Sequence, residues 1–244
     1  ERRAYYLALL AEKLKDPGFR KIAGFPTGED EDILELSDPP YYTACPNPWI
    51  SDFISFWKDL SIKEDDYEYH REPFAADVSE GKNDPIYNAH SYHTKVPHKA
   101  VMRYILHYTE PGDIVFDGFS GTGMTGVAAR MCGDKDVILS LGYKIQDNDI
   151  ILQEVVGEDD RKKWEPFSKL GERKFILNDL SPAATFISKN YNSPVDLLFF
   201  EKEVDNIIAK VKKECSWMYE TKHSDGGLGE IVYVLWSDIF ICKE

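Results

Sequence analysis

The sequence has few cysteines, no long apolar run and a shortage of positive charge. Four cysteines in 244 residues, with no CxxC pair, exclude a disulfide framework. The longest apolar stretches, such as residues 197–200, fall far short of the roughly 20 residues that span a bilayer. No charged-then-apolar leader opens the chain. These absences predict a cytoplasmic protein without a membrane segment.

The charge is unbalanced, because the sequence has 29 lysines and arginines but 43 aspartates and glutamates, which gives a formal net charge of −14. Taken alone, this argues against a nucleic-acid partner, but phosphate binding needs only a local basic groove. Hydrophobic residues at 43% and aromatic residues at 13% exclude wholesale disorder. The length suits one large domain or two small ones. Both ends look cut, so we expect part of a longer protein.

Apolar periodicity predicts three regions. Residues 1–60 show an N-terminal helical pattern, then a run at 33–36 that suits a buried strand, a proline-rich loop and a second helical pattern. Residues 61–98 are polar and without a clear period, so we expect a long mobile loop. Residues 99–244 are expected to hold an α/β part, with a charged, irregular insertion at 133–173.

Strand and helix patterns alternate in the third region. Short strands are predicted at residues 114–116, 175–177 and 231–235, with a possible hairpin at 143–149. Helices are predicted at residues 99–108, 127–131, 183–191 and 201–219. Such alternation predicts an α/β fold with a doubly wound, Rossmann-like sheet, incomplete in this chain.

A glycine-rich turn at residues 117–126 lies between the first of these strands and a helix. Backbone N–H groups at such a helix start can face a ligand, and glycine permits close approach. The turn lacks the lysine of a triphosphate-binding loop and the full dinucleotide glycine spacing, which favours another ligand. Asp179 follows the next strand, where an acid normally accepts ribose hydroxyls. A tight turn without a ligand is the alternative.

These residues resemble a known family. Phe116 to Gly126 read F-D-G-F-S-G-T-G-M-T-G and are similar to the S-adenosylmethionine motif of amino-group DNA methyltransferases, commonly D-P-F-x-G-x-G-T-T. Residues 93–97 resemble that family's upstream motif, and residues 178–182 its second cofactor motif. The resemblance implies a Rossmann-like methyltransferase fold with S-adenosylmethionine as cofactor. The cofactor-binding residues that it implies are Thr94, Lys95, Asp117, Phe119, Ser120, Gly121, Thr122, Gly123 and Asp179.

Asp38-Pro39-Pro40-Tyr41 is the strongest single motif. The exocyclic amine of a base is a poor nucleophile because its lone pair is delocalised into the ring. Asp38 and the carbonyl of Pro39 are suited to accept both amine protons, and proline rigidity holds that carbonyl in place. Tyr41 offers a face on which an extruded base can stack. The structural alternative is a proline-rich corner in which Asp38 caps a turn.

The resemblance also specifies class and substrate. In the beta class of the family this motif precedes the cofactor motif, as Tyr41 precedes Asp117 here, and an initial aspartate favours adenine over cytosine. DNA is therefore the expected partner, although the chain displays no separate recognition region. The alternatives are methylation of RNA or a protein amide, and a non-catalytic cofactor-binding subunit of a larger assembly. The sequence leaves the oligomeric state open.

No metal site is predicted. The histidines at 90, 93 and 98, with Cys45, match no structural zinc spacing. Cys242 could begin a CxxC pair only if the chain continues beyond residue 244.

Overall fold

The computed structural model describes residues 2–60, 68–157 and 160–240, so Cys242 lies outside the described residues. The chain forms two compact units, Glu1–Ser193 and Pro194–Glu244. No helix among the described residues combines the length and the apolar character that a bilayer crossing requires.

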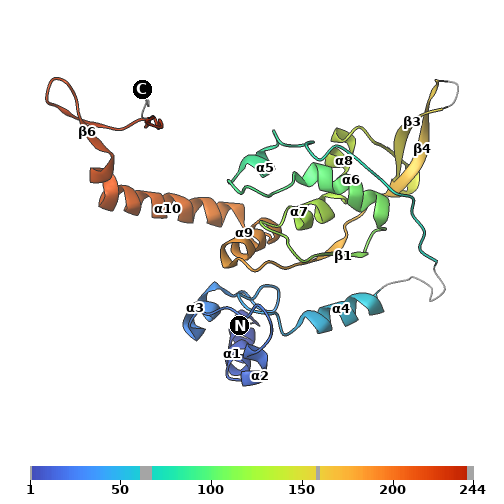
Figure 1. Ribbon diagram of the computed structural model, residues 1–244, viewed down its shortest axis with the longest axis horizontal. Helices are drawn as coiled ribbons and strands as arrows, with labels where there is room; N and C mark the ends of the chain where they lie inside the picture. Colours follow the sequence, from blue (N-terminus) through green and yellow to red (C-terminus); the bar gives the residue numbers. More distant parts are fainter. Residues whose placement is uncertain (1, 61–67, 158–159, 241–244) are drawn as a thin grey trace. The chain divides into compact units, whose positions relative to one another are not determined.

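The N-terminal part of the first unit is helical. It contains α1 (Arg2–Leu14), α2 (Pro17–Arg20), α3 (Asp30–Leu36) and α4 (Ile50–Asp59) (Figure 1). The first three helices surround a small core of Leu10, Leu14, Phe19, Ile33 and Cys45. The two helical patterns predicted for residues 1–60 are confirmed.

The strand predicted at residues 33–36 is wrong, because these residues complete helix α3. The first turn of α3 holds three acidic residues, 30–32, which interact favourably with the helix dipole. Only Ile33 of the helix is buried, against the N-terminal core. A four-residue apolar run does not separate strand from helix by period, and here the flanking acids favoured the helix.

The central part of the first unit is built on two parallel strands, β1 (Ile114–Asp117) and β5 (Lys174–Leu177). Their register pairs Ile114 with Lys174 and Asp117 with Leu177. The helices of this part are α6 (His98–Tyr108), α7 (Met124–Met131) and α9 (Pro182–Asn192). These elements confirm the strands and helices predicted around the glycine turn.

Residues 133–173 are more ordered than the sequence indicated. They contain α8 (Lys135–Ser140), β2 (Lys144–Gln146), η1 (Asp147–Asp149), β3 (Ile150–Val156) and β4 (Lys162–Lys169). The three strands form an antiparallel sheet separate from β1 and β5, and the expected hairpin is present as β2 and β3. The description as irregular is therefore wrong, because Ile138, Leu141 and Ile151 join the core with residues of α6 and α7, and Arg173 at the end of the stretch is buried as well.

The segment from residue 68 to 97 has an irregular course apart from α5 (Pro85–Asn88). Helix α6 holds it at several points. The Tyr104 hydroxyl bonds the backbone of Ala76, at 3.1 Å to both N and O, and the Tyr108 hydroxyl accepts from Phe74 N at 2.9 Å. The mobility predicted for residues 61–98 stays a prediction, and residues 61–67 lie outside the described ranges.

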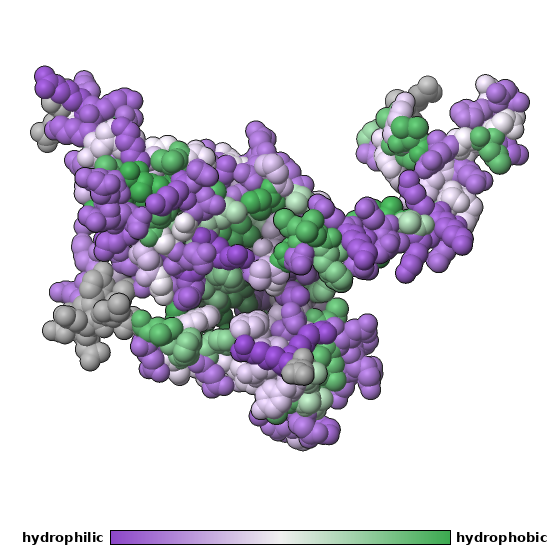
Figure 2. Space-filling view, turned by 180° about the vertical axis from the view of Figure 1, so that it is seen from behind, coloured by the Kyte–Doolittle hydropathy of each residue, from purple (hydrophilic) through white to green (hydrophobic). Residues whose placement is uncertain are grey.

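The second unit contains α10 (Leu197–Cys215), η2 (Ser216–Tyr219), β6 (Glu220–Lys222) and β7 (Leu228–Glu230). No residue of α10 is buried, and Figure 2 shows hydrophobic and hydrophilic side chains along this helix. The helix predicted at 201–219 is confirmed as far as Cys215, where α10 ends and η2 follows, and α10 begins earlier than predicted, at Leu197. The strand predicted at 231–235 is wrong, because the β6–β7 pairing ends at Glu230 and the apolar side chains beyond it are exposed.

The chain is therefore mixed α/β. In the described ranges the strands form three small sheets, β1–β5, β2–β3–β4 and β6–β7. The α/β class is confirmed in this coarser form. The doubly wound sheet stays a prediction.

Candidate functional site

The glycine turn reverses the chain between the end of β1 at Asp117 and the start of α7 at Met124. Gly121 has φ 52° and Gly123 has φ 82°, both in the left-handed region. Gly123 is also the residue that caps α7. Side chains disfavour this backbone conformation, so the tight turn itself requires glycine at both positions.

Gly123→Ala is expected to destabilise the fold by about 2–3 kcal/mol, from left-handed strain plus a steric clash. A Cβ at Gly123 would lie 2.2 Å from Ser188 Oγ and 2.8 Å from Asn192 Nδ2. The matched control is Gly112→Ala, because Gly112 has φ 84° but nothing within 4 Å of its Cβ position. Urea unfolding should show the smaller loss for the control. Equal losses would mean that α9 does not press on the turn.

Two acidic residues hold the backbone of the turn, Asp117 from its start and Asp179 from the segment that follows β5. Asp117 accepts from the Thr125 hydroxyl at 2.6 Å and from Phe119 N at 3.1 Å. Asp179 accepts from Gly121 N and Ser181 N, both at 2.9 Å. The parallel pairing of β1 and β5 therefore brings Asp179 to the glycine turn. Each carboxylate can still accept further hydrogen bonds, since it offers about four lone-pair positions.

The turn also contains polar groups that lack a partner. Ser120 and Thr122 are buried, and their hydroxyl oxygens have no hydrogen bond within the described part of the chain. A buried hydroxyl left unpaired costs about 1–3 kcal/mol. Phe119, which directly precedes Ser120, is 89% exposed. The turn thus presents unused hydrogen-bonding capacity that suits a polar ligand.

The residue directly before the upstream motif contacts the glycine turn, and motif reasoning did not indicate it. A Cβ at Gly121 would lie 3.3 Å from Tyr92 Cε1, so Tyr92 packs against the turn. Thr94 is exposed. The Lys95 ammonium donates to the carbonyls of Tyr87 and His90, and burial lowers the pKa of Lys95. Lys95 therefore ties residues 87–95 together and donates its bonds within that segment.

We use the name DPPY loop for residues 38–42. It is closed by two backbone hydrogen bonds, from Asp38 N to Tyr42 O at 2.9 Å and from Tyr42 N to Asp38 O at 3.1 Å. The Pro40 carbonyl accepts from Asn47 Nδ2 at 2.8 Å, which braces the loop from the following turn. Tyr41 is 70% exposed, with its ring 5.6 Å from that of Phe53. One face of an aromatic ring is thus presented beside Asp38.

The Asp38 carboxylate lies between two cations. Its Oδ1 is 3.2 Å from Arg3 Nε, and its Oδ2 is 3.2 Å from Lys189 Nζ. The Tyr42 hydroxyl lies 3.3 Å from Thr185 Oγ1, and burial raises the pKa of Tyr42. Motif reasoning missed Arg3, Lys189 and Thr185, and no local pattern marks them.

The described residues hold no cluster of metal ligands, and two of their cysteines are buried. No group of three or more His, Cys, Asp or Glu residues within the described ranges could hold a metal ion. Burial raises the pKa of Cys45 to about 11 and that of Cys132 to about 12, so both thiols stay protonated at neutral pH.

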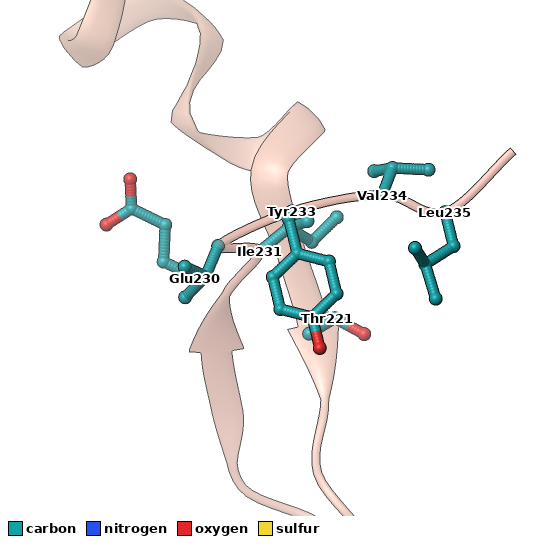
Figure 3. Close-up of a pocket in the computed structure, with 7 residues that line it drawn as sticks. Thr221, Glu230, Ile231, Tyr233, Val234 and Leu235 are labelled. Atoms are coloured by element: carbon teal, nitrogen blue, oxygen red, sulfur yellow. The ribbon is translucent and has the colours of Figure 1, made fainter.

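A pocket of about 430 Å³ lies in the second unit beside β6 and β7 (Figure 3). Its lining is Thr221, Glu230, Ile231, Val232, Tyr233, Val234 and Leu235. Figure 3 shows the Glu230 carboxylate pointing away from the Tyr233 ring. The pocket contains none of the predicted site residues and lacks convergent polar groups.

The first unit thus joins a glycine turn with unused hydrogen-bonding groups and a carboxylate-bearing loop on an α/β framework. A family model described as DNA methylase, the N6_N4 amino-group methyltransferases, matches residues 15–155. Because this is more than half of the chain, the protein belongs to that family. The match includes the DPPY loop, the upstream motif and the glycine turn, and it ends before Asp179. Neither the curated proteins nor the solved structures gave a match.

Family membership indicates DNA amino-methyltransferase activity in general, with DNA as the molecule acted on. The family is generally S-adenosylmethionine-dependent.

Proposed function

We propose that this chain carries an S-adenosylmethionine-dependent methyltransferase site of the beta class, which acts on the exocyclic amine of a DNA base, adenine in preference to cytosine. One observation carries the proposal. The DPPY loop contacts α9 through Asp38 and Tyr42, and α9 begins three residues after Asp179, beside the glycine turn. A base-binding loop and a cofactor turn therefore meet on one helix.

The cofactor would supply an activated methyl group. The Ser120 and Thr122 hydroxyls are suited to bond its polar portion, because they are buried and lack partners among the described residues. Asp179 is suited to accept from ribose hydroxyls while keeping its bond to Gly121. Asp117 shapes the turn through Thr125. Lys95 would act indirectly, by holding the segment that places Tyr92, and the exposed Thr94 stays a predicted cofactor contact.

The target amine would be activated by the DPPY loop. Asp38 and the Pro39 carbonyl would accept its two protons and draw the nitrogen toward tetrahedral geometry, while Tyr41 stacks on the extruded base. Methyl transfer would break the bond between the methyl carbon and the cofactor sulfur as the nitrogen bonds that carbon, which would leave the nitrogen positively charged. Asp38 would then accept one of the nitrogen's protons. The bracing of Pro40 by Asn47 keeps this geometry rigid.

Three broader predictions belong to the same proposal. The β1–β5 pair would be the centre of a doubly wound sheet completed outside this chain, with residues 133–173 as an insertion. DNA recognition would need regions outside the chain, which fits its formal charge of −14. The alternatives are an RNA or protein-amide methyltransferase and a non-catalytic subunit.

Transfer of labelled methyl groups tests the proposal. Unmethylated DNA, RNA and protein are offered separately, and labelled nucleosides are identified after digestion. Labelled N6-methyladenine is the expected product. Labelled N4-methylcytosine would still support a DNA amino-methyltransferase but would contradict the preference for adenine. Labelling of RNA or protein alone, or no transfer by a chain that binds cofactor, would overturn the proposal.

Asp179→Asn is expected to weaken S-adenosylmethionine binding by roughly 5- to 150-fold. Charge-assisted hydrogen bonds of about 1–3 kcal/mol are lost with the carboxylate. Calorimetry measures the affinity. Asp134→Asn is the matched control, because Asp134 also accepts backbone N–H bonds, at the start of α8. Unchanged affinity in Asp179→Asn would reject the ribose role.

A further inference from the structure

Helix α9 contacts the glycine turn with one row of side chains. Asn192 Nδ2 donates to the Gly123 carbonyl at 3.0 Å and to the Ser188 carbonyl at 2.9 Å. Ser188 is buried, and its hydroxyl lies so close to Gly123 that a Cβ there would clash. The helix is therefore packed tightly against the residue that begins α7.

A neighbouring row on α9 holds the DPPY loop. Thr185 and Lys189 are four residues apart and thus lie on the same side of the helix, one turn from each other. Thr185 Oγ1 is 3.3 Å from the Tyr42 hydroxyl, and Lys189 Nζ is 3.2 Å from Asp38 Oδ2. Asp38 and Tyr42 are the two residues whose backbones close the loop. Helix α9 therefore contacts both ends of the DPPY loop.

The ion pair between Lys189 and Asp38 contributes little to the free energy of unfolding. Its side chains are 24% exposed at Lys189 and 42% at Asp38, and pairs this accessible contribute about 0–1 kcal/mol. Arg3 occupies the other Asp38 oxygen and also donates to the Ser37 carbonyl at 3.1 Å, so the loop has a separate brace from α1. What Lys189 adds is a link from Asp38 to the helix that packs on the glycine turn.

We propose that Thr185 and Lys189 are positioning residues that set the DPPY loop at a fixed separation from the glycine turn. The inference rests on the proposed function and extends it to residues outside the family match, which ends at residue 155. Methyl transfer needs the two reacting atoms held in line at close range, and a displacement of about 1 Å can cost roughly 100-fold in rate. Helix α9, which is bonded to both the DPPY loop and the glycine turn, would fix the separation of the reacting atoms.

The test uses Lys189→Met and Thr185→Val in the whole chain. Single-turnover methyl transfer at saturating DNA and cofactor should slow by roughly 10- to 100-fold for each variant. Cofactor affinity and the unfolding midpoint should stay unchanged. Lys189→Arg and Thr185→Ser should restore most of the rate, because each restores the polar contact. Asn190→Ala is the control on the same helix, since this exposed side chain bonds the Phe186 carbonyl of its own helix.

Hydrogen exchange gives a reading that does not depend on activity. The backbone amides of Asp38 and Tyr42 should exchange faster in Lys189→Met than in the unsubstituted chain, because the loop is less firmly docked. Unchanged rates of exchange and transfer would overturn the inference, as would joint loss of stability, cofactor binding and activity, which marks a folding role. If the unsubstituted chain methylates nothing, the proposed function and the positioning role both fall, and faster exchange would then show only a structural contact.

Discussion

Asp38→Ala is expected to slow single-turnover methyl transfer by about 10²–10³-fold, the usual cost of removing a hydrogen bond formed in the transition state. Cofactor affinity should be unchanged, because Asp38 lies in the DPPY loop and not in the glycine turn. The loop should keep its shape, since the bonds between Asp38 and Tyr42 that close it are made by the backbone. Transfer of labelled methyl to unmethylated DNA measures the rate.

Asp77→Ala is the matched control for this prediction. Asp77 is a surface turn aspartate whose carboxylate accepts from Ser79, and backbone and side-chain bonds to Ser79 lower its pKa. It should retain full activity. If Asp38→Ala retained methyl transfer, the assignment of the DPPY loop to the active site would be rejected. Joint loss of transfer and cofactor binding would assign the loop to folding.

Arg173→Met is expected to destabilise the fold by about 3–5 kcal/mol, the cost of removing one member of a buried polar network. Arg173 is 2% exposed and donates to the carbonyls of Thr109, Lys169 and Gly171. It also bonds the hydroxyls of Thr109 and Ser168. Methionine fills part of the same space but has no donor, so these half-buried acceptors would lose their bonds to Arg173.

Urea unfolding measures this loss, with Arg130→Met as the control. Arg130 is exposed, and its guanidinium makes a long hydrogen bond of 3.4 Å to the Asn192 carbonyl, so its replacement should change stability by less than about 0.5 kcal/mol. Because Arg173 directly precedes β5, its loss should also loosen Asp179 at the far end of that strand. Equal midpoints for the two variants would contradict the role of Arg173 as an anchor.

The local elements of the site could be predicted from the sequence because their causes are local. Left-handed backbone at Gly121 and Gly123 requires glycine, and a strand, turn and helix in that order have a recognisable pattern. The prolines of the DPPY loop likewise restrict the chain without help from distant residues. Short apolar runs gave errors at 33–36 and 231–235, since burial decides their structure and burial is a property of the whole fold.

The sequence by itself determined the two motifs and the helices around them, because conformational restriction and helical period act over a few residues. Only the tertiary structure decided that α9 joins those motifs. Lys189 and Thr185 reach Asp38 and Tyr42 across more than a hundred residues of chain, and Arg3 reaches Asp38 from another helix. Contacts between such distant residues depend on how helices pack and leave no period or spacing in the sequence.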